Sequence, residues 1–273
     1  MTAWHKARRW CLALTLSALA GWAQAQGAAA KSGFQPEVGQ PGKDVVWVPT
    51  PEELVQKMLD MAKLTPKDFV MDLGSGDGRT VIAAARRGAR AMGIEYNPEM
   101  VELSRRNASR AGVSSRATFE NADLFQTDLS RASVITMFLL TDINLRLRPT
   151  LLALKPGTRV VSNTFRMGDW EPDQTAELHC GSYCTAYLWI VPARVDGGWK
   201  TAQGTLALKQ TYQNFTGTLQ NGGRSEPVLK GKLNGDRISF TAGGAEYRGT
   251  VKGKVIEGTV KSGGKSQSWK ATR

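Results

Sequence analysis

The stretch Asp72-Leu73-Gly74-Ser75-Gly76-Asp77-Gly78 is the most informative part of the sequence for the fold, and it begins inside a short apolar segment at 69–73. That segment has the length and composition of a buried strand, and the residues from Thr80 to about Arg87 have the periodicity of a helix. Glycines at such a junction let the backbone approach a ligand and adopt conformations that other residues avoid. The stretch therefore predicts a ligand-binding loop between a strand and a helix.

The glycine spacing differs from that of a dinucleotide-binding loop. In the Gly-x-Gly-x-x-Gly fingerprint, the third glycine comes one residue later than Gly78 does here. Asp72 also places a carboxylate beside the loop, where it repels a diphosphate and attracts a positively charged amino group. These features disfavour NAD and FAD and favour a ligand that carries an amino group.

Strand and helix patterns alternate around this loop. Predicted helices begin at Pro51, Thr80, Pro98 and Asn144, and predicted strands cover 69–73, 90–96, 117–122, 133–140 and 159–165. Such alternation is typical of a parallel sheet with helices on both faces. Two more strands, at 177–179 and 186–195, flank a cysteine-containing turn as an antiparallel hairpin. We expect an α/β fold with a doubly wound, mostly parallel sheet of seven strands over residues 45–195.

Carboxylates follow three of these strands at their carboxyl ends. Asp72 ends the first strand, Glu95 and then Tyr96 end the second, and Asp123 follows the third. Open α/β sheets bind ligands in the crevice outside these ends. Each acid alone is also typical of a strand end or a helix cap. Together with the glycine loop, they predict a pocket for an adenosine that carries an amino acid.

These motifs resemble those of class I S-adenosylmethionine-dependent methyltransferases, in which motif I corresponds to 72–80 and acids follow the second and third strands. The resemblance implies that S-adenosylmethionine binds with its amino acid end near Asp72 and Gly74, its ribose on Glu95 and its adenine beside Asp123. The cofactor-binding residues that it implies are Asp72, Gly74, Ser75, Gly76, Gly78, Glu95, Tyr96 and Asp123.

Four shorter motifs resemble bacterial relatives of the mitochondrial protein-lysine methyltransferases that act on the ATP synthase c-subunit. They are Pro49-Thr50-Pro51, the stretch 72–79, Gly93-Ile94-Glu95-Tyr96-Asn97 and Phe138-Leu139-Leu140. The resemblance implies a protein substrate that is methylated on lysine. Thr141 departs from that group, which usually carries a proline after its two leucines, and small-molecule methylation is the alternative. The fourth strand also lacks the Asp/Asn-Pro-Pro-aromatic motif of amino-methylating nucleic-acid enzymes, which argues against a nucleic acid.

The catalytic residues stay unassigned, because methyl transfer from a sulfonium mainly requires a neutral nucleophile held in line with the methyl group. Candidates to line the acceptor channel are Asn163, Phe165 and Trp170. The two aromatic residues equally suit a position in the core or at the rim.

The N-terminus has the organisation of a secretory signal peptide. Basic residues precede an apolar stretch from Cys11 to Ala20 and a small-x-small site, Ala23-Gln24-Ala25. We expect cleavage after Ala25 and export to a bacterial periplasm, with an uncleaved anchor over residues 1–25 as the alternative. Residues 26–44 lack apolar periodicity and are expected to form a flexible lead-in. No later apolar run approaches the roughly 18 residues that span a bilayer, so stable membrane insertion is not expected.

Export raises a question about the cofactor, which is made in the cytosol. Either the domain is an active methyltransferase, or it is a retained binding module for an adenosine compound. The intact set of Asp72, Glu95 and Asp123 favours activity, because a module that only binds a ligand does not need all three acids.

Cleavage leaves two cysteines, in the run His179-Cys180-Gly181-Ser182-Tyr183-Cys184. Export permits a disulfide, and a pair closed across the Gly-Ser turn is favoured over two free thiols. His179 and two sulfurs supply only three ligands, so no metal site is predicted.

The C-terminal part, residues 196–273, is a different kind of sequence. Pairs such as Asn234-Gly235 and Gly263-Gly264 separate short alternating stretches, which predicts a small antiparallel meander or barrel of six or seven strands. Of the formal net charge of +12, residues 194–273 carry +9, from 14 basic and 5 acidic side chains. This charge suits docking on an anionic surface, or a merely solubilising face. Aromatic residues expected in its core are Trp199, Tyr212, Phe215, Phe240, Tyr247 and Trp269.

Overall fold

The computed structural model describes residues 34–202 and 204–273. The predicted signal peptide, its cleavage site after Ala25 and the start of the predicted lead-in lie outside the described residues. Within the described part of the chain, no helix is both long enough and apolar enough to cross a membrane.

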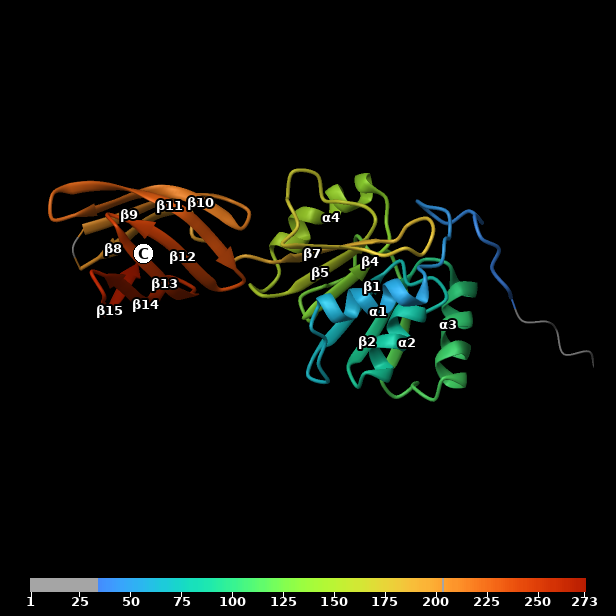
Figure 1. Ribbon diagram of the computed structural model, residues 1–273. Coiled ribbons are helices and arrows are strands. Elements are labelled where there is room, and N and C mark those ends of the chain that lie inside the picture. Colours follow the sequence, from blue (N-terminus) through green and yellow to red (C-terminus); the bar gives the residue numbers. More distant parts are fainter. Residues whose placement is uncertain (1–33, 203) are drawn as a thin grey trace, which may run out of the picture. The chain divides into compact units, whose positions relative to one another are not determined.

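A seven-stranded sheet follows the N-terminal segment (Figure 1). Its strands are β1 (Phe69–Leu73), β2 (Arg90–Glu95), β3 (Ala117–Asn121), β4 (Val134–Met137), β5 (Arg159–Asn163), β6 (Gln174–Glu177) and β7 (Thr185–Ile190). Their order in the sheet is β3-β2-β1-β4-β5-β7-β6. Strands β1 to β5 run parallel, whereas β7 runs antiparallel to β5 and to β6. The predicted seven-stranded sheet is confirmed and ends in an antiparallel pair, but β6 precedes its predicted position at 177–179 and β7 ends at Ile190 rather than at 195.

Helices cover both faces of this sheet. Among the described residues they are α1 (Glu52–Met61), α2 (Arg79–Arg86), α3 (Pro98–Arg110) and α4 (Thr141–Leu152). Helices α1, α2 and α3 share one apolar core with Val70 and Val134, whereas α4 packs in a second core with Met71 and Ile135. Neighbouring strand residues enter different cores because successive side chains of a strand point to opposite faces.

Helix α4 begins at Thr141, three residues before the predicted start at Asn144. The chain is extended at Leu140, and Asp142 lies in the first turn, where the helix dipole favours an acid. Strand β4 correspondingly ends at Met137 rather than Leu140. Residues 138–140 therefore form a loop at the carboxyl end of β4.

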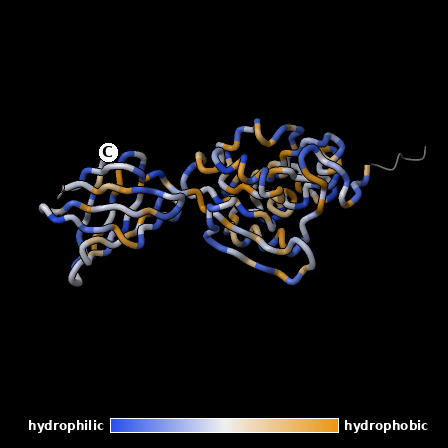
Figure 2. Tube along the Cα trace, turned by 90° about the horizontal axis from the view of Figure 1, so that it is seen from above, coloured by the Kyte–Doolittle hydropathy of each residue, from blue (hydrophilic) through white to orange (hydrophobic). Residues whose placement is uncertain are grey.

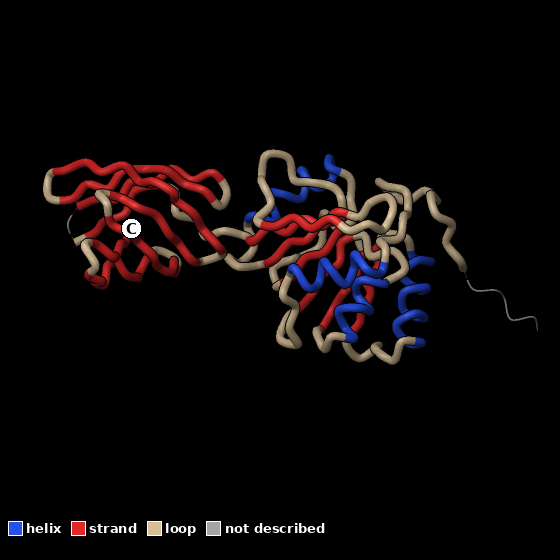
Figure 3. Tube along the Cα trace, in the orientation of Figure 1, coloured by secondary structure: helices blue, strands red, loops and turns tan. Residues whose placement is uncertain are grey.

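Residues from Gly197 onward form a closed antiparallel barrel, which is built of strands and turns (Figure 3). Its strands are β8 (Gly197–Thr201), β9 (Gly204–Thr211), β10 (Asn214–Asn221), β11 (Arg224–Asn234), β12 (Arg237–Ala242), β13 (Ala245–Lys252), β14 (Val255–Ser262) and β15 (Lys265–Thr272). Strand β15 pairs with β8 and closes the barrel. The prediction of six or seven strands is too low, because β8 begins with two glycines and lacks an alternating pattern.

Hydrophobic and hydrophilic residues alternate along the barrel strands (Figure 2), so one face of each strand fills the interior. Trp199, Phe215 and Phe240 are buried there, and Tyr247 and Trp269 are partly buried beside them. The predicted positions of these five aromatic residues are confirmed.

Tyr212 does not lie in the barrel core, which corrects its predicted position. It occupies the turn between β9 and β10, and its ring stacks on Trp170 with the ring centroids 5.9 Å apart. The neighbouring Gln213 is buried and accepts a hydrogen bond from Trp170 Nε1 at 2.9 Å. Residues of a turn, which leaves the strand alternation, are not placed by a strand pattern.

Candidate functional site

A cavity lies at the carboxyl ends of β1, β2 and β4, the edge at which open α/β sheets bind ligands. Its wall is built from the glycine loop, the segments that follow β2 to β5, the turn between β6 and β7, and residues 40–50. The predicted site residues that line it are Asp72, Gly74, Ser75, Gly76, Glu95, Tyr96 and Asp123. The topology thus brings together residues from widely separated parts of the chain.

The glycine loop is held by backbone hydrogen bonds to the end of β2. The N–H groups of Gly74 and Ser75 both donate to the carbonyl of Ile94, at 2.9 and 3.0 Å. Gly76 has a φ of +55°, and a Cβ there would lie 2.6 Å from Trp47 Nε1. Any other residue at this position is therefore strained and crowded.

Asp72 is a buried carboxyl at the end of β1. Its Oδ1 accepts a hydrogen bond from the Thr136 hydroxyl at 2.6 Å. Burial, together with the nearby Asp77 and Glu95, raises the pKa of Asp72 to about 7 against the opposing effect of the Thr136 hydrogen bond. A positively charged ligand group would offset this cost by favouring the ionised carboxylate.

Glu95 is oriented by two backbone amides. Its Oε2 accepts from the N–H of Gly76 at 3.0 Å, and its Oε1 accepts from the N–H of Asn97 at 2.9 Å. Each carboxylate oxygen retains a free lone pair, because an ionised carboxylate has about four acceptor sites. The group is therefore held in place beside the loop and can still accept from a ligand hydroxyl.

Asp123 pairs with a lysine from the N-terminal segment. Lys43 Nζ lies 2.8 Å from Asp123 Oδ2 and 4.4 Å from the centroid of the Tyr96 ring. The hydrogen bond from Lys43 holds the pKa of Asp123 below its usual range, with help from the N–H of Phe125. Lys43 belongs to residues 40–44, which the sequence assigns to a flexible lead-in but which line the cavity.

Gly78 lies outside the cavity wall. It caps the N-terminus of α2 with a φ of +83°, and a Cβ there would come within 2.9 Å of Phe119 and Ser104. Glycine is needed at position 78 because Phe119 and Ser104 pack closely against it behind the loop, rather than because it contacts a ligand. Ser75 does line the cavity, and its buried hydroxyl has no hydrogen-bond partner among the described residues.

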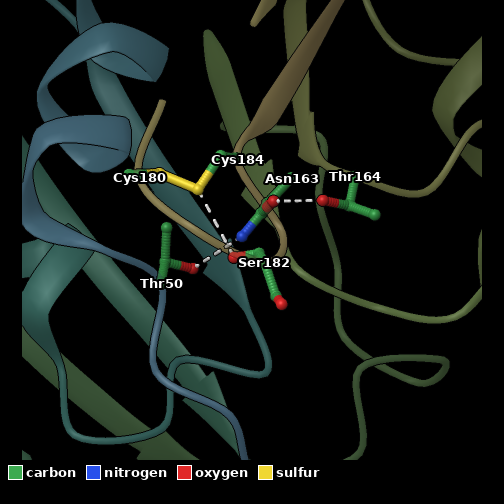
Figure 4. Close-up of a disulfide and its surroundings, with 6 residues drawn as sticks. All are labelled: Thr50, Asn163, Thr164, Cys180, Ser182 and Cys184. Carbon is green, nitrogen blue, oxygen red and sulfur yellow. Dashed lines mark hydrogen bonds between the residues drawn. A yellow bond between two sulfur atoms is a disulfide. The ribbon is translucent and has the colours of Figure 1, made fainter. Parts of the chain in front are cut away.

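Of the three predicted channel residues, only Phe165 lines the cavity. Trp170 is fully buried in the core, where Trp189 Nε1 donates to its carbonyl at 2.6 Å. Asn163 is also fully buried and acts as a brace, because its Nδ2 donates to Thr50 Oγ1 at 3.3 Å (Figure 4).

Sequence reasoning did not assign two aromatic residues that share the cavity wall with Phe165. They are Phe138, in the loop after β4, and Tyr183, in the turn between β6 and β7. Phe138 belongs to a motif already noted in the sequence, and Tyr183 belongs to the cysteine run, but neither motif by itself indicates that the side chain faces a ligand.

The polar groups of this cavity suit an adenosine with an amino acid better than a phosphate ligand. Asp72, Glu95 and Asp123 place negative charge in its wall, where it would repel a phosphate. The orphaned Ser75 hydroxyl and the free lone pairs of Glu95 leave polar capacity for ligand hydroxyl or amino groups. The residues present therefore fit the predicted cofactor.

Two family models match this chain. The ANTKMT methyltransferase domain matches residues 72–174, and a DNA methylase model matches residues 22–106. The first range spans the glycine loop, Glu95, Asp123 and the segments after β4 and β5.

Several of the curated relatives are lysine methyltransferases. A protein-lysine N-methyltransferase of Saccharolobus islandicus (strain REY15A) is 42% identical over 151 residues, which cover 54% of this chain and 94% of that protein. The ATP synthase c-subunit lysine N-methyltransferase of Mus musculus is 38% identical over 130 residues, which cover 47% of this chain. The chain spans about half the length of the mouse protein, 52%.

A solved structure with the same fold carries a different description. It is the RNA methyltransferase from Salinibacter ruber in complex with S-adenosyl-L-homocysteine. It is 47% identical, with a TM-score of 0.52, over 54% of this chain and 96% of that one. The described acceptors of the relatives thus include both protein and RNA.

Proposed function

The chain belongs to the class I S-adenosylmethionine-dependent methyltransferases, in the group related to the ATP synthase c-subunit lysine methyltransferases, and we propose that it N-methylates lysine side chains of a protein. The observation that carries this proposal is the cavity itself. It joins three acids at strand ends to an aromatic wall formed by Phe138, Phe165 and Tyr183. The 42% identity to a protein-lysine methyltransferase over 94% of its length supports the acceptor class.

The acidic side of the cavity is proposed to hold the cofactor. Asp72 would receive its amino group, Glu95 its ribose hydroxyls and Asp123 its adenine, with Gly74, Ser75, Gly76 and Tyr96 forming the surrounding wall. When bound, S-adenosylmethionine supplies a methyl group on a positively charged sulfonium.

The aromatic side of the cavity is proposed to receive the acceptor amine. A lysine amine must be neutral to attack, and desolvation by apolar side chains lowers the pKa of a buried ammonium. Phe138, Phe165 and Tyr183 would exclude water and hold the amine in line with the methyl group. This arrangement requires no dedicated catalytic base.

RNA is the second candidate acceptor. The description of the Salinibacter ruber protein favours RNA, and the match to a DNA methylase model favours a nucleic-acid acceptor only in general. The segment Phe138-Leu139-Leu140-Thr141 opposes it, because it differs from the Asp/Asn-Pro-Pro-aromatic motif of amino-methylating nucleic-acid enzymes. We therefore place protein lysine first.

Export to the periplasm is part of the proposal. Its support is the N-terminal sequence and the disulfide between Cys180 and Cys184, since disulfides persist in oxidising compartments. The net charge of +9 on residues 194–273 supports a further proposal, that the barrel docks the enzyme on an anionic surface.

The proposed function is tested by cofactor binding and methyl transfer on the same preparation. S-adenosylhomocysteine is titrated by calorimetry into the chain and into an Asp72→Ala variant, and we expect binding that the variant loses. Transfer of labelled methyl from S-adenosylmethionine is then measured on envelope protein extract, on the same extract with its lysines chemically blocked, and on total RNA.

Each outcome decides between the candidates. Labelling of the extract that lysine blocking abolishes supports lysine methylation. Labelling of RNA alone overturns the protein acceptor in favour of the second candidate. Cofactor binding without labelling of either would leave a small-molecule acceptor or a binding module, and absence of binding would refute the methyltransferase itself.

A further inference from the structure

Three aromatic rings from three separate segments meet in the cavity wall. Phe138 and Phe165 are stacked with centroids 6.0 Å apart, and Tyr183 lies 5.4 Å from Phe138 and 6.3 Å from Phe165. We call these three residues the aromatic triad. None of them belongs to the acidic side of the cavity, where the cofactor is proposed to bind.

The triad differs from the aromatic packing of the protein core. Trp170 and Trp189 are fully buried, and their rings pack in a tilted arrangement within the core of the sheet domain. Tyr183, in contrast, leaves 44% of its surface exposed although its ring contacts two others. Phe138 and Phe165 are half-buried. A cluster of large rings that is only partly covered and lies in a cavity wall is typical of a ligand site rather than of a core.

Two of the segments that carry these rings have an unusual backbone conformation. Thr164, directly before Phe165, has a φ of +60°, and Tyr183 has a φ of +61°. Positive φ is uncommon for residues other than glycine and is costly for a β-branched residue such as threonine. Strained residues of this kind persist where the surrounding structure holds them, and they cluster at binding sites.

Hydrogen bonds hold the strained segment before Phe165. Asn163 Oδ1 accepts from Thr164 Oγ1 at 2.8 Å, and Asn163 Nδ2 donates to Thr50 Oγ1 (Figure 4). The carbonyl of Phe165 accepts from Ser162 Oγ at 2.7 Å and from Asn144 Nδ2 at 3.1 Å. The backbone that carries the Phe165 ring is therefore fixed from two sides.

The disulfide between Cys180 and Cys184 fixes the other side of the triad. It closes a short turn that contains Tyr183, and the Cys184 sulfur lies 3.4 Å from the carbonyl oxygen of Ser182 (Figure 4). This is a close contact rather than a hydrogen bond, because an oxidised sulfur has no proton to donate. The N–H of Leu178 also donates to the carbonyl of Cys184 at 2.9 Å. The turn has little freedom to carry Tyr183 away.

The aromatic triad differs from other rings of this basic protein in its relation to lysine and arginine side chains. Among the described residues, a lysine or arginine lies over the ring of Phe69, Tyr96, Phe125, Tyr187, Trp199 or Tyr212. Within residues 34–202 and 204–273, no lysine or arginine lies over the ring of Phe138, Phe165 or Tyr183. Its ring faces are therefore available to a cation from outside the chain.

From these observations we infer that the aromatic triad binds the alkylammonium group that forms when a neutral lysine amine accepts the methyl group, and that it accommodates lysine that already carries methyl groups. A cation within about 6 Å of a ring centroid is attracted by the ring face, and the attraction grows when the cation is desolvated. Methylated ammonium sheds water more readily than the unmethylated group, so the triad retains the cationic product of one transfer. This product loses a proton to water before it accepts the next methyl group. The inference rests on the proposed lysine methylation, and it assigns the part of the cavity that binds the lysine side chain.

The test separates charge from shape. Ligand-observed NMR measures the binding of Nα-acetyl-trimethyllysine amide to the full chain saturated with S-adenosylhomocysteine. The comparison ligand is the isostere in which a carbon replaces the ammonium nitrogen. We expect the cation to bind about fivefold more tightly than the neutral isostere. Equal binding of the two ligands, or no binding of either, overturns the inference.

Three variants locate the effect. Tyr183→Phe keeps the ring and should preserve the preference for the cation, whereas Tyr183→Leu should abolish it. The double variant Cys180→Ser, Cys184→Ser should weaken it as well, because the turn is released. A double variant that retains the full preference would refute the positioning role of the disulfide.

Binding of S-adenosylhomocysteine to each variant separates this inference from the proposed function. Retained cofactor binding and lysine labelling, together with equal binding of the two isosteres, means that only the triad assignment is wrong. Loss of cofactor binding in the unmodified chain removes the methyltransferase and the inference together.

Discussion

The sheet domain and the barrel place their polar groups in opposite ways. In the sheet domain, strands that run parallel bring Asp72, Glu95 and the segment before Asp123 to one edge, where part of this acidic set is buried. In the barrel, strands pair with both neighbours around a closed ring, and charged side chains such as Glu257 and Lys270 lie on the outside. Several carboxyl ends of strands lie side by side at one edge only in the first arrangement, because the strands of the barrel are antiparallel.

This difference explains where the chemistry lies. Burying a carboxyl beside other acids is costly, as the pKa of Asp72 shows, which is raised mainly by burial and further by Asp77 and Glu95. A fold retains such a group where a ligand offsets the cost. The barrel pairs opposite charges across strands and has an apolar interior. We therefore expect substitutions in the sheet domain to affect both stability and cofactor binding, and substitutions in the barrel to affect stability alone.

The largest expected effect comes from a matched pair of leucines, Leu73 in β1 and Leu233 in β11. Both side chains are fully buried, so replacing either by alanine should lower the free energy of unfolding by about 2–5 kcal/mol. Leu73 immediately precedes Gly74, so Leu73→Ala should also weaken binding of S-adenosylhomocysteine. Chemical unfolding measures the first effect, and calorimetric titration under folding conditions measures the second.

Leu233→Ala serves as the control for this pair. It should leave the affinity for S-adenosylhomocysteine unchanged while destabilising the protein by a similar amount. If Leu233→Ala weakens binding of S-adenosylhomocysteine as much as Leu73→Ala does, then the expectation that barrel substitutions leave cofactor binding unaffected is wrong.

The sequence predicts the sheet because its signals are local. Alternating strand and helix patterns, the glycine loop and an acid at each strand end all lie within short windows, and β1 to β3 agree closely with the predicted segments. The cofactor side of the cavity follows from the same signals, since parallel strands must end at one edge. Gly78 departs from that set because glycine spacing does not distinguish contact with a ligand from packing behind the loop.

The acceptor side could not be predicted in the same way. Phe138, Phe165 and Tyr183 are far apart in sequence and meet only because β4, β5 and the β6–β7 turn are neighbours in the sheet. The contact of Lys43 with Asp123 likewise joins residues 80 positions apart, without any pattern at residues 40–44. The contact of Tyr212 with Trp170 could not be predicted either. Tyr212 lies in a turn of the barrel, and its ring packs on a tryptophan in the core of the sheet domain.

The next effect is a pH dependence confined to the sheet domain. With the pKa of Asp72 raised to about 7, its carboxyl is mostly protonated at pH 6 and mostly ionised at pH 8. A protonated carboxyl does not attract a ligand amino group, so the affinity for S-adenosylhomocysteine should fall about tenfold as the pH falls from 8 to 6. Calorimetry across this range measures it.

Asp72→Asn provides the control, because an amide does not titrate and should give weaker binding that is constant with pH. At pH 6 the unmodified chain should release a proton on binding, which appears as a dependence of the binding heat on the ionisation heat of the buffer. A flat affinity profile in the unmodified chain would show that Asp72 does not face the ligand's amino group.

The smallest effect on the free energy of unfolding is expected from removing a carboxylate of the barrel, Glu257. We compare it with removal of a carboxylate of the sheet domain, Asp68. Glu257 pairs with Lys270 at 2.8 Å, but both side chains are more than half exposed, so water and salt screen the pair. Glu257→Gln should therefore leave the unfolding midpoint unchanged at neutral pH.

Asp68, the counterpart in the sheet domain, is mostly buried and accepts hydrogen bonds from Arg159, Ser133 and the N–H of Thr65. Asp68→Asn should lower the free energy of unfolding by about 1–3 kcal/mol, because buried partners lose their acceptor.

The pH dependence of unfolding sharpens this last contrast. Hydrogen bonds from Arg159, Ser133 and Thr65 outweigh burial and hold the pKa of Asp68 below its usual range, so its stabilising contribution is complete above pH 3.8. That contribution is lost as the pH falls through the lowered pKa, and Asp68→Asn should remove this part of the acid dependence. Glu257→Gln should leave the acid limb nearly unchanged despite the lowered pKa of Glu257, because its pair is exposed. If Glu257→Gln shifts the acid limb as strongly as Asp68→Asn does, then the surface charges of the barrel stabilise the fold, and the division between a region that buries its charges and one that exposes them does not hold.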